Sequence, residues 1–358
     1  MMKDKNIGDV NFIDRNVLTA VLREAERRGL EVRFILMGGS LSEGLASSAS
    51  DIDLVVVHDG ERKSNNIVMI VEGVKVEATV FGQQDFSRII GMGRQGAAGA
   101  AYFWQLDARR RLLFSRPIHG HDAYEAQFRQ ARLDDFVADL AEFQKSLAIK
   151  SFSDVKGAFD DALHEDDLRI RCRIHLEHSV DLLLSSLGDY YFREKYRMAR
   201  IRRSLKGDCL ALVEDSISAL LSGRMPAGGG STSLSAWSGQ VFAYSSLCQY
   251  LAAFSDFWPG WLTVGDVERF LQKPVLESPV GIFLFDKDVL CQSRRAAFKI
   301  PTAFANAMAL TLLGFSEVRV AEGIEAYARY ESARGRDEVV PGNLLQRKLE
   351  EIMVKLGV

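Results

Sequence analysis

Residues 39–53 read GSLSEGLASSASDID, and they join two strongly apolar runs. The run before them, VRFILM at 32–37, has the length and composition of a buried strand and ends at Gly38-Gly39-Ser40. The run after them, DIDLVVV at 51–57, opens with two carboxylates at alternate positions. A strand, a Gly-Ser turn and a second strand that begins with paired acids therefore decide the fold.

A third β-branched run, VKVEATVF at 74–81, is bounded by glycines on both sides. Upstream, apolar residues at helical spacing end at Gly29, which predicts a helix before the first strand. We expect little or no helix between Gly38 and Phe81. The three strands are therefore predicted to form one compact, partly antiparallel sheet.

The two acids of the second strand suggest a cation site. Strand alternation puts Asp51 and Asp53 on one face, while Ile52 points to the other. Two carboxylates side by side repel each other unless something neutralises them, and Mg²⁺ commonly binds through one or two carboxylates plus substrate phosphates. Gly39 allows a phosphate to approach the backbone, and Ser40 can donate hydrogen bonds to it.

This pattern resembles the nucleotidyltransferase fold of the DNA polymerase β superfamily over residues 32–81. The family signature is an apolar strand, Gly-Ser, a spacer, acid-apolar-acid and a third acid on a later strand. Here these are Gly39-Ser40, Asp51-Ile52-Asp53 and Glu77. Glu43 departs from the Arg or Lys that small bacterial members often carry there. Residues 109–120 look, less specifically, like the strand and turn that close such a domain.

The resemblance implies transfer of a nucleoside monophosphate from an NTP to a hydroxyl, with release of pyrophosphate. It implies that Asp51 and Asp53 ligate two Mg²⁺ ions, and that Glu77 completes the ion nearer the acceptor and helps take the hydroxyl proton. Gly39 and Ser40 would hold the β- and γ-phosphates. Taken singly, each piece also fits an ordinary turn or a solvated strand. Their conjunction favours the site, and an inactive copy is the less favoured version because all three acids are present.

The rest of the chain has a different character. Apolar residues at helical spacing predict helices at about 128–148, 168–187, 209–221 and 241–254, with one good strand at 280–285. We therefore predict an α+β fold. A nucleotidyltransferase domain at 1–125, with a mixed sheet and helices, is followed by a mainly helical domain at 126–358 that completes the NTP and acceptor cleft.

One segment of the helical part carries a second, weaker resemblance. Residues 187–196, LGDYYFREKY, are similar to a Tyr-Phe-x-x-Lys-aromatic segment in the helical domains of some small-molecule nucleotidyltransferases, where the lysine faces the triphosphate. This implies that Lys195 binds the nucleotide. The alternative is a solvated basic face formed by Lys195 with Arg193, Arg197, Arg200, Arg202, Arg203 and Lys206.

Two further groups have structural and functional interpretations. His175 and His178 lie on a predicted helix without a carboxylate framework, so we expect core or interface histidines rather than metal ligands. The acidic run 160–167 precedes a predicted helix, and acids at a helix start are stabilised by its dipole. The functional alternative is an acidic wall that attracts a cationic acceptor.

Composition narrows the class of protein. The chain has 358 residues, with 45 Lys plus Arg against 48 Asp plus Glu, and its pI is near 6.1, which argues against a protein that coats nucleic acid. Its four cysteines form no CxxC pair and fit buried side chains in a reducing compartment. The first residues are charged where a signal peptide is apolar, and no run spans a bilayer, so we expect a cytoplasmic protein that does not enter a membrane.

The favoured function is Mg²⁺-dependent nucleotidylation of a small hydroxylated molecule, with ATP the favoured donor and a cationic acceptor slightly preferred over a neutral one. In layout the chain resembles the aminoglycoside nucleotidyltransferases. The rival classes are a modifier of a protein or an RNA end, as in toxin–antitoxin systems, and a nucleotide-sensing module that keeps the fold. The sequence leaves open the NTP base, the acceptor and the oligomeric state.

Overall fold

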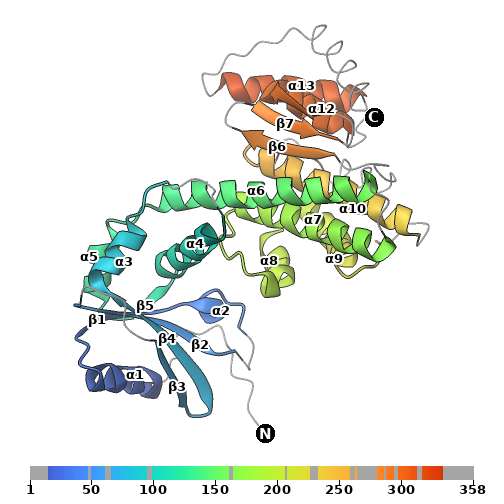
Figure 1. Cartoon of the computed structure of the whole chain (residues 1–358). Helices are drawn as coiled ribbons and strands as arrows, with labels where there is room; N and C mark the ends of the chain where they lie inside the picture. The colour runs from blue at the N-terminus through green and yellow to red at the C-terminus, as the bar shows by residue number, and fades with distance from the viewer. Residues whose placement is uncertain are drawn as a thin grey trace. The chain divides into compact units, whose positions relative to one another are not determined.

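The computed structural model describes residues 15–46, 50–60, 66–94, 99–160, 164–205, 208–225, 233–258, 263, 280–285, 288–293, 297–312 and 317–333. By its internal contacts the chain divides into two compact units, Met1–Glu142 and Phe143–Val358 (Figure 1). The first unit thus extends beyond residue 125, where the sequence analysis ended the catalytic domain. The division falls inside a long helix, α6 (Leu133–Asp160).

The first unit holds a five-stranded mixed sheet. Its elements are α1 (Arg15–Arg27), β1 (Val32–Met37), α2 (Gly39–Ser42), β2 (Ile52–His58), β3 (Ile67–Val71), β4 (Val74–Gly82), α3 (Gln83–Ile90), α4 (Gly99–Leu113), β5 (Arg116–His119) and α5 (His121–Phe128), followed by the start of α6. The strand order is β3-β4-β2-β1-β5. β2 and β4 are parallel and every other pair is antiparallel. The predicted partly antiparallel sheet is therefore confirmed, with β3 as a strand that the sequence analysis did not expect.

The two faces of this sheet are covered differently. Alternate residues of β1, β2 and β4, such as Ile35, Leu54 and Ala78, pack with Val17 and Val21 of α1 in one apolar cluster. On the opposite face Phe34 meets Phe86 of α3 and Tyr124 of α5. Since side chains alternate along a strand, Asp53 of β2 belongs to the face opposite α1. The apolar core thus fixes which face presents the acids.

One predicted strand is a helix. Residues 109–113, expected in the strand that closes the catalytic domain, lie in α4, and the strand itself is only β5. Arg109 is buried and donates to Asp139 at 2.7 Å, while Arg110 donates to Asp107 at 3.1 Å. Arg109 and Arg110 thus fill buried helix positions that apolar residues normally occupy. The apolar residues of α4 therefore do not recur at helical spacing, and the sequence pattern does not indicate a helix.

The second unit combines helices with a small sheet. After the remainder of α6 it contains α7 (Glu165–Ser186), η2 (Glu194–Tyr196), α8 (Arg197–Ser204), α9 (Asp208–Leu221), α10 (Leu234–Ala253), β6 (Gly281–Phe285), β7 (Asp288–Gln292), β8 (Ala297–Pro301), α12 (Thr302–Leu312) and α13 (Glu317–Ser332). β6, β7 and β8 form an antiparallel meander. The predicted α+β fold is confirmed, although only the first strand of this sheet was expected.

The core of the second unit lies around α7 and α10, whose apolar residues share one cluster. His175 is buried there, with its Nδ1 3.1 Å from Ser151 Oγ, and burial lowers its pKa to about 3. It is a core histidine, as expected. Cys172, Cys248 and Cys291 are buried free thiols, also as expected. Among the described residues, no helix is both long and apolar enough to cross a membrane.

Candidate active site

The Gly-Ser turn between β1 and β2 is built around a close approach to Asp53. Gly39 opens the single turn α2 with a φ of +68°, in the left-handed region that favours glycine. A Cβ at this position would overlap the Asp53 carboxylate and lie 2.7 Å from its Cγ. The turn closes on itself, because Leu45 N–H donates to Ser40 C=O at 2.8 Å and Ser42 Oγ donates to Gly39 C=O at 3.0 Å. Ser40, within this turn, is buried.

The pairing of β2 with β4 brings two of the predicted acids together. In this parallel register Asp53 lies opposite Glu77, and Ile52 lies opposite Val76. Asp51 directly precedes β2, so alternation places it on the same face as Asp53. The side chains of Asp51 and Glu77 are partly exposed, at 37% and 38%. Three carboxylates therefore lie on one face of two neighbouring strands, beside the turn at Gly39.

A lysine that the sequence analysis did not consider lies among these acids. Lys75 Nζ is 2.9 Å from Glu77 Oε2 and 3.6 Å from Asp51 Oδ2. The hydrogen bond from Lys75 to Glu77, together with the nearby charges of Glu77 and Asp51, raises the pKa of the lysine. Its position two residues before Glu77, hence on the same strand face, is the signal that could have identified it.

The donor set fits a hard divalent cation in kind, because all three predicted ligands are carboxylates that solvent can reach. Their side chains, however, are not arranged as the ligands of a metal ion are. Among the residues that the structure describes, no group of three or more His, Cys, Asp or Glu side chains lies close enough together to hold a metal ion. Lys75 supplies part of the neutralising charge instead. The metal roles of Asp51, Asp53 and Glu77 stay predictions.

Lys195, the predicted nucleotide ligand, belongs to the second unit. It lies in the short helix η2, it is exposed, and its Nζ is 4.8 Å from the centre of the Tyr196 ring. An exposed ammonium on a short turn is accessible to an anionic ligand. Its role in nucleotide binding also stays a prediction.

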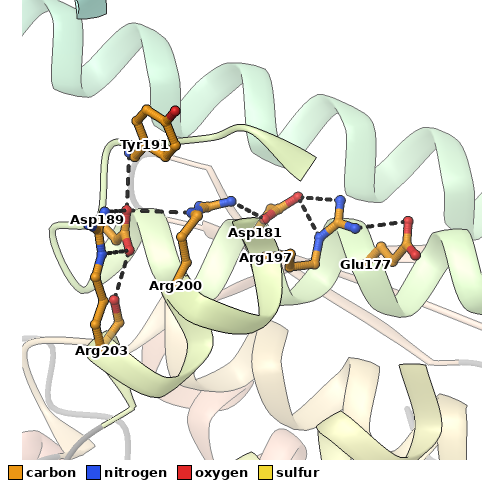
Figure 2. Close-up of polar contacts among 8 residues, drawn as sticks. Glu177, Asp181, Asp189, Tyr191, Arg197, Arg200 and Arg203 are labelled. Carbon is orange, nitrogen blue, oxygen red and sulfur yellow. Dashed lines mark hydrogen bonds and ion pairs between the residues drawn. The ribbon is translucent and has the colours of Figure 1, made fainter. Parts of the chain in front are cut away.

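The segment that carries Lys195 is held by a buried ionic network (Figure 2). Asp181 of α7 accepts from Arg197 Nη2 at 2.9 Å and from Arg200 Nη1 at 2.8 Å. Arg197 also pairs with Glu177 at 3.1 Å. Arg197 and Arg200 are buried, so the alternative of a solvated basic face is wrong for these two residues. They are buried because α7 and the turn after it supply carboxylate partners.

Asp189 is the second acidic centre of this network. It accepts from Arg203 Nε and Nη2 at 2.9 and 2.8 Å, from Ser204 Oγ at 2.9 Å and from Tyr191 N–H at 3.1 Å (Figure 2). Burial acts to raise its pKa, but the hydrogen bond and charge of Arg203 and the charge of Arg200 outweigh burial, so the pKa is lowered. The Asp189 carboxylate thus joins the segment that precedes η2 to the helix α8 that follows it.

The acidic run 160–167 has a structural role in the described residues. Asp160 ends α6, residues 161–163 lie outside the described residues, and α7 begins at Glu165. Its first turn contains Glu165, Asp166 and Asp167, the charge that a helix N-terminus favours. This geometry agrees with the structural interpretation of the run.

Comparison with known proteins bears on the first unit. Residues 18–96 match the family model described as a nucleotidyltransferase domain. The matched segment includes the Gly39-Ser40 turn and the acids Asp51, Asp53 and Glu77. The match supports nucleotidyl transfer in general, and hence a transferase enzyme. No curated protein matches the chain.

Proposed function

We propose that this protein transfers a nucleoside monophosphate, with AMP from ATP favoured, to a hydroxyl of a small-molecule acceptor and releases pyrophosphate. The observation that carries the proposal is the register of β2 and β4. It sets Asp53 opposite Glu77 beside the Gly39 turn, within the segment that matches a nucleotidyltransferase domain.

In this proposal different residues of the first unit bind the metal ions, accept the proton and bind the phosphates. Asp51 and Asp53 would hold two Mg²⁺ ions, and Glu77 would hold the ion nearer the acceptor. When bound, such ions neutralise charge on the reacting phosphate and acidify the attacking hydroxyl. Glu77 is the carboxylate proposed to accept the hydroxyl proton. The backbone at Gly39 and Ser40 would hold the β- and γ-phosphates.

Lys195 of the second unit would add a charged contact to the triphosphate. The network around Asp181 and Asp189 supports this proposal, because it holds the turn that carries Lys195 while leaving the lysine itself exposed. A fixed turn reduces the entropy that is lost when the contact forms.

For the acceptor we propose a small molecule, with a cationic one favoured over a nucleic acid. The acidic balance of the chain supports this choice, with 48 acidic against 45 basic residues. Several of its arginines are also engaged in buried ion pairs and cannot contact phosphates. A nucleic acid would need several such contacts and would bind with a steep salt dependence.

The test is a screen of all four NTPs with Mg²⁺ and a panel of aminoglycosides, aminocyclitols, RNA and single-stranded DNA, with pyrophosphate release as the readout. The matched variants are Asp51→Asn and Asp59→Asn. Both acids are partly exposed at opposite ends of β2, and each pairs with a cation, Lys75 or Arg33. We expect loss of pyrophosphate release in Asp51→Asn alone. Full activity of Asp51→Asn with Mg²⁺ would refute the proposal, and label transferred from NTP to an RNA end would refute the small-molecule acceptor.

A further inference from the structure

Lys75 is placed to act on the carboxylate site. It lies in β4 two residues before Glu77, and the register with β3 puts it opposite Ile70. Its Nζ contacts Glu77 at 2.9 Å and Asp51 at 3.6 Å, and 47% of its side chain is exposed. One ammonium thus joins two of the three acids proposed to bind metal.

The negative charges of Asp51, Asp53 and Glu77 need positive charge nearby both with and without a bound metal ion. Three neighbouring carboxylates repel one another, and one nearby cation lowers that repulsion. The ammonium of Lys75 carries a single positive charge, whereas a divalent cation carries two and requires the same oxygens. A divalent ion and an ammonium bound to the same carboxylate would also repel each other.

This competition accounts for two observations at once. Glu77 accepts a hydrogen bond from Lys75, and the described acids do not converge on a single point as metal ligands would. Release of the Lys75 contacts would leave the side chains of Asp51 and Glu77 able to turn toward Asp53, because both are partly exposed.

We propose that Lys75 is the counter-ion of the metal-free site, and that a divalent cation binds by displacing its ammonium from Glu77 and Asp51. Lys75 is therefore a positioning residue that sets how tightly the site holds metal. This inference rests on the proposed function, because it takes Asp51, Asp53 and Glu77 as the ligands.

A second lysine provides a matched control. Lys299 of β8 pairs with Asp288 of β7 at 3.2 Å, and its side chain is 61% exposed. It is also a strand lysine in an exposed ion pair, but among the described residues its pair is with Asp288, which has no proposed metal role. The difference between the two lysines isolates the effect of the carboxylate site.

The experiment measures Mn²⁺ binding to the full chain without nucleotide, by calorimetry and by electron paramagnetic resonance of the free ion. The variants are Lys75→Gln, Lys75→Arg and Lys299→Gln, each checked for folding by circular dichroism. Each exposed ion pair is worth a factor of about 1.5 to 5 in an equilibrium constant. Loss of two pairs predicts that Lys75→Gln binds Mn²⁺ about two- to twenty-fivefold more tightly, while the other two variants match the wild type.

Thermal unfolding gives a second readout. In chelator, Lys75→Gln should unfold at a lower temperature than wild type, because the acids have lost their counter-ion. Added Mn²⁺ should then raise its unfolding temperature by more than it raises that of the wild type.

The outcomes separate this inference from the proposed function. If the wild type binds Mn²⁺, Asp51→Asn abolishes binding and Lys75→Gln leaves the affinity unchanged or weaker, the role of Lys75 is wrong and the metal site stands. If Lys75→Arg tightens binding as much as Lys75→Gln, charge is not the cause and the inference fails. If no variant binds Mn²⁺, both the inference and the metal-dependent function fail.

Discussion

Replacement of Gly39 by alanine disturbs the Gly-Ser turn and the Asp53 carboxylate together. The residue has a φ of +68°, and an added Cβ would lie 2.7 Å from Asp53 Cγ and 2.8 Å from Asp53 Cβ. Carbon atoms in ordinary contact are about 3.5–4.0 Å apart. The carboxylate, or the turn, must therefore move by about 1 Å.

Gly44 provides the matched control for this change. It has a φ of +67°, in the same segment, but a Cβ there would meet nothing within 4 Å. A left-handed conformation costs a non-glycine residue about 1–2 kcal/mol, so both alanine variants should lose this much stability. For a unit of this size that corresponds to a fall in Tm of about 2–10 °C. Only Gly39→Ala also moves Asp53.

The assay compares the two variants for Tm and for pyrophosphate release from NTP with Mg²⁺. Because a 1 Å misplacement of a reacting group can cost about a hundredfold in rate, we expect Gly39→Ala to lose about that much activity. Gly44→Ala should remain near wild type at a temperature where it is folded. Equal activity of the two variants would contradict the proposed role of the Gly39–Asp53 contact.

Three further predictions concern the other site residues. Glu77→Gln should lower the single-turnover rate more than it lowers NTP affinity, because its proposed role arises in the transition state; a large loss of binding with unchanged chemistry would place Glu77 elsewhere. Lys195→Ala should weaken NTP binding about tenfold or more, whereas Arg202→Ala, which among the described residues loses an exposed 3.8 Å pair with Glu214, should change little in calorimetry. Asp189→Asn should destabilise the protein by about 3–5 kcal/mol in urea unfolding, because it removes a buried carboxylate charge that pairs with Arg203 and Arg200. The pKa of Asp189 in the folded protein is below its ordinary value of 3.8, so the ionised carboxylate stabilises the fold fully above that value and less as it becomes protonated. The difference in unfolding free energy between wild type and Asp189→Asn should therefore be largest above about pH 4 and should shrink as the pH falls further. A loss independent of pH would contradict that account.

The sequence was sufficient for the part of the fold with simple patterns. β1, β2 and β4 are apolar runs rich in β-branched residues, and their predicted ranges agree with the structure to within about one residue at each end. The helices α7, α9 and α10 also lie where apolar spacing predicted them, although α10 begins at Leu234, earlier than expected. In these segments the spacing of apolar residues along the sequence is enough to predict which elements form.

The errors have a common physical cause, because partners distant in sequence decide those segments. Residues 109–113 lie in α4 although their local pattern indicates a strand, because Arg109 is buried there through partners such as Asp139 of α6. β7 and β8 are short and mixed in composition, and they are strands because each pairs with a neighbour in the meander. No local pattern reveals such pairings.

The candidate site was predictable in its residues and not in its contacts. The spacing of Gly39, Asp51 and Asp53 identified the turn and the paired acids. That Asp53 lies opposite Glu77 depends on the register of two strands that are not adjacent in the chain, which the sequence does not specify. The place of Lys75 two residues before Glu77 puts it on the same strand face, but its contacts with Glu77 and Asp51 are visible only in the structure.

The connectivity of the five-stranded sheet implies an order of assembly. β3 and β4 are joined through Glu72 and Gly73, both at positive φ as in a tight two-residue hairpin turn, so this hairpin can form locally and fast. β5, in contrast, pairs with β1 across about 80 residues, as at Leu36 and Pro117, and contacts of such separation form slowly. We therefore expect the Asp53–Glu77 pair to form when β2 docks on a preformed hairpin, and β5 to join last. A chain shortened to the matched residues 18–96 would lack β5 and leave one side of β1 without its strand.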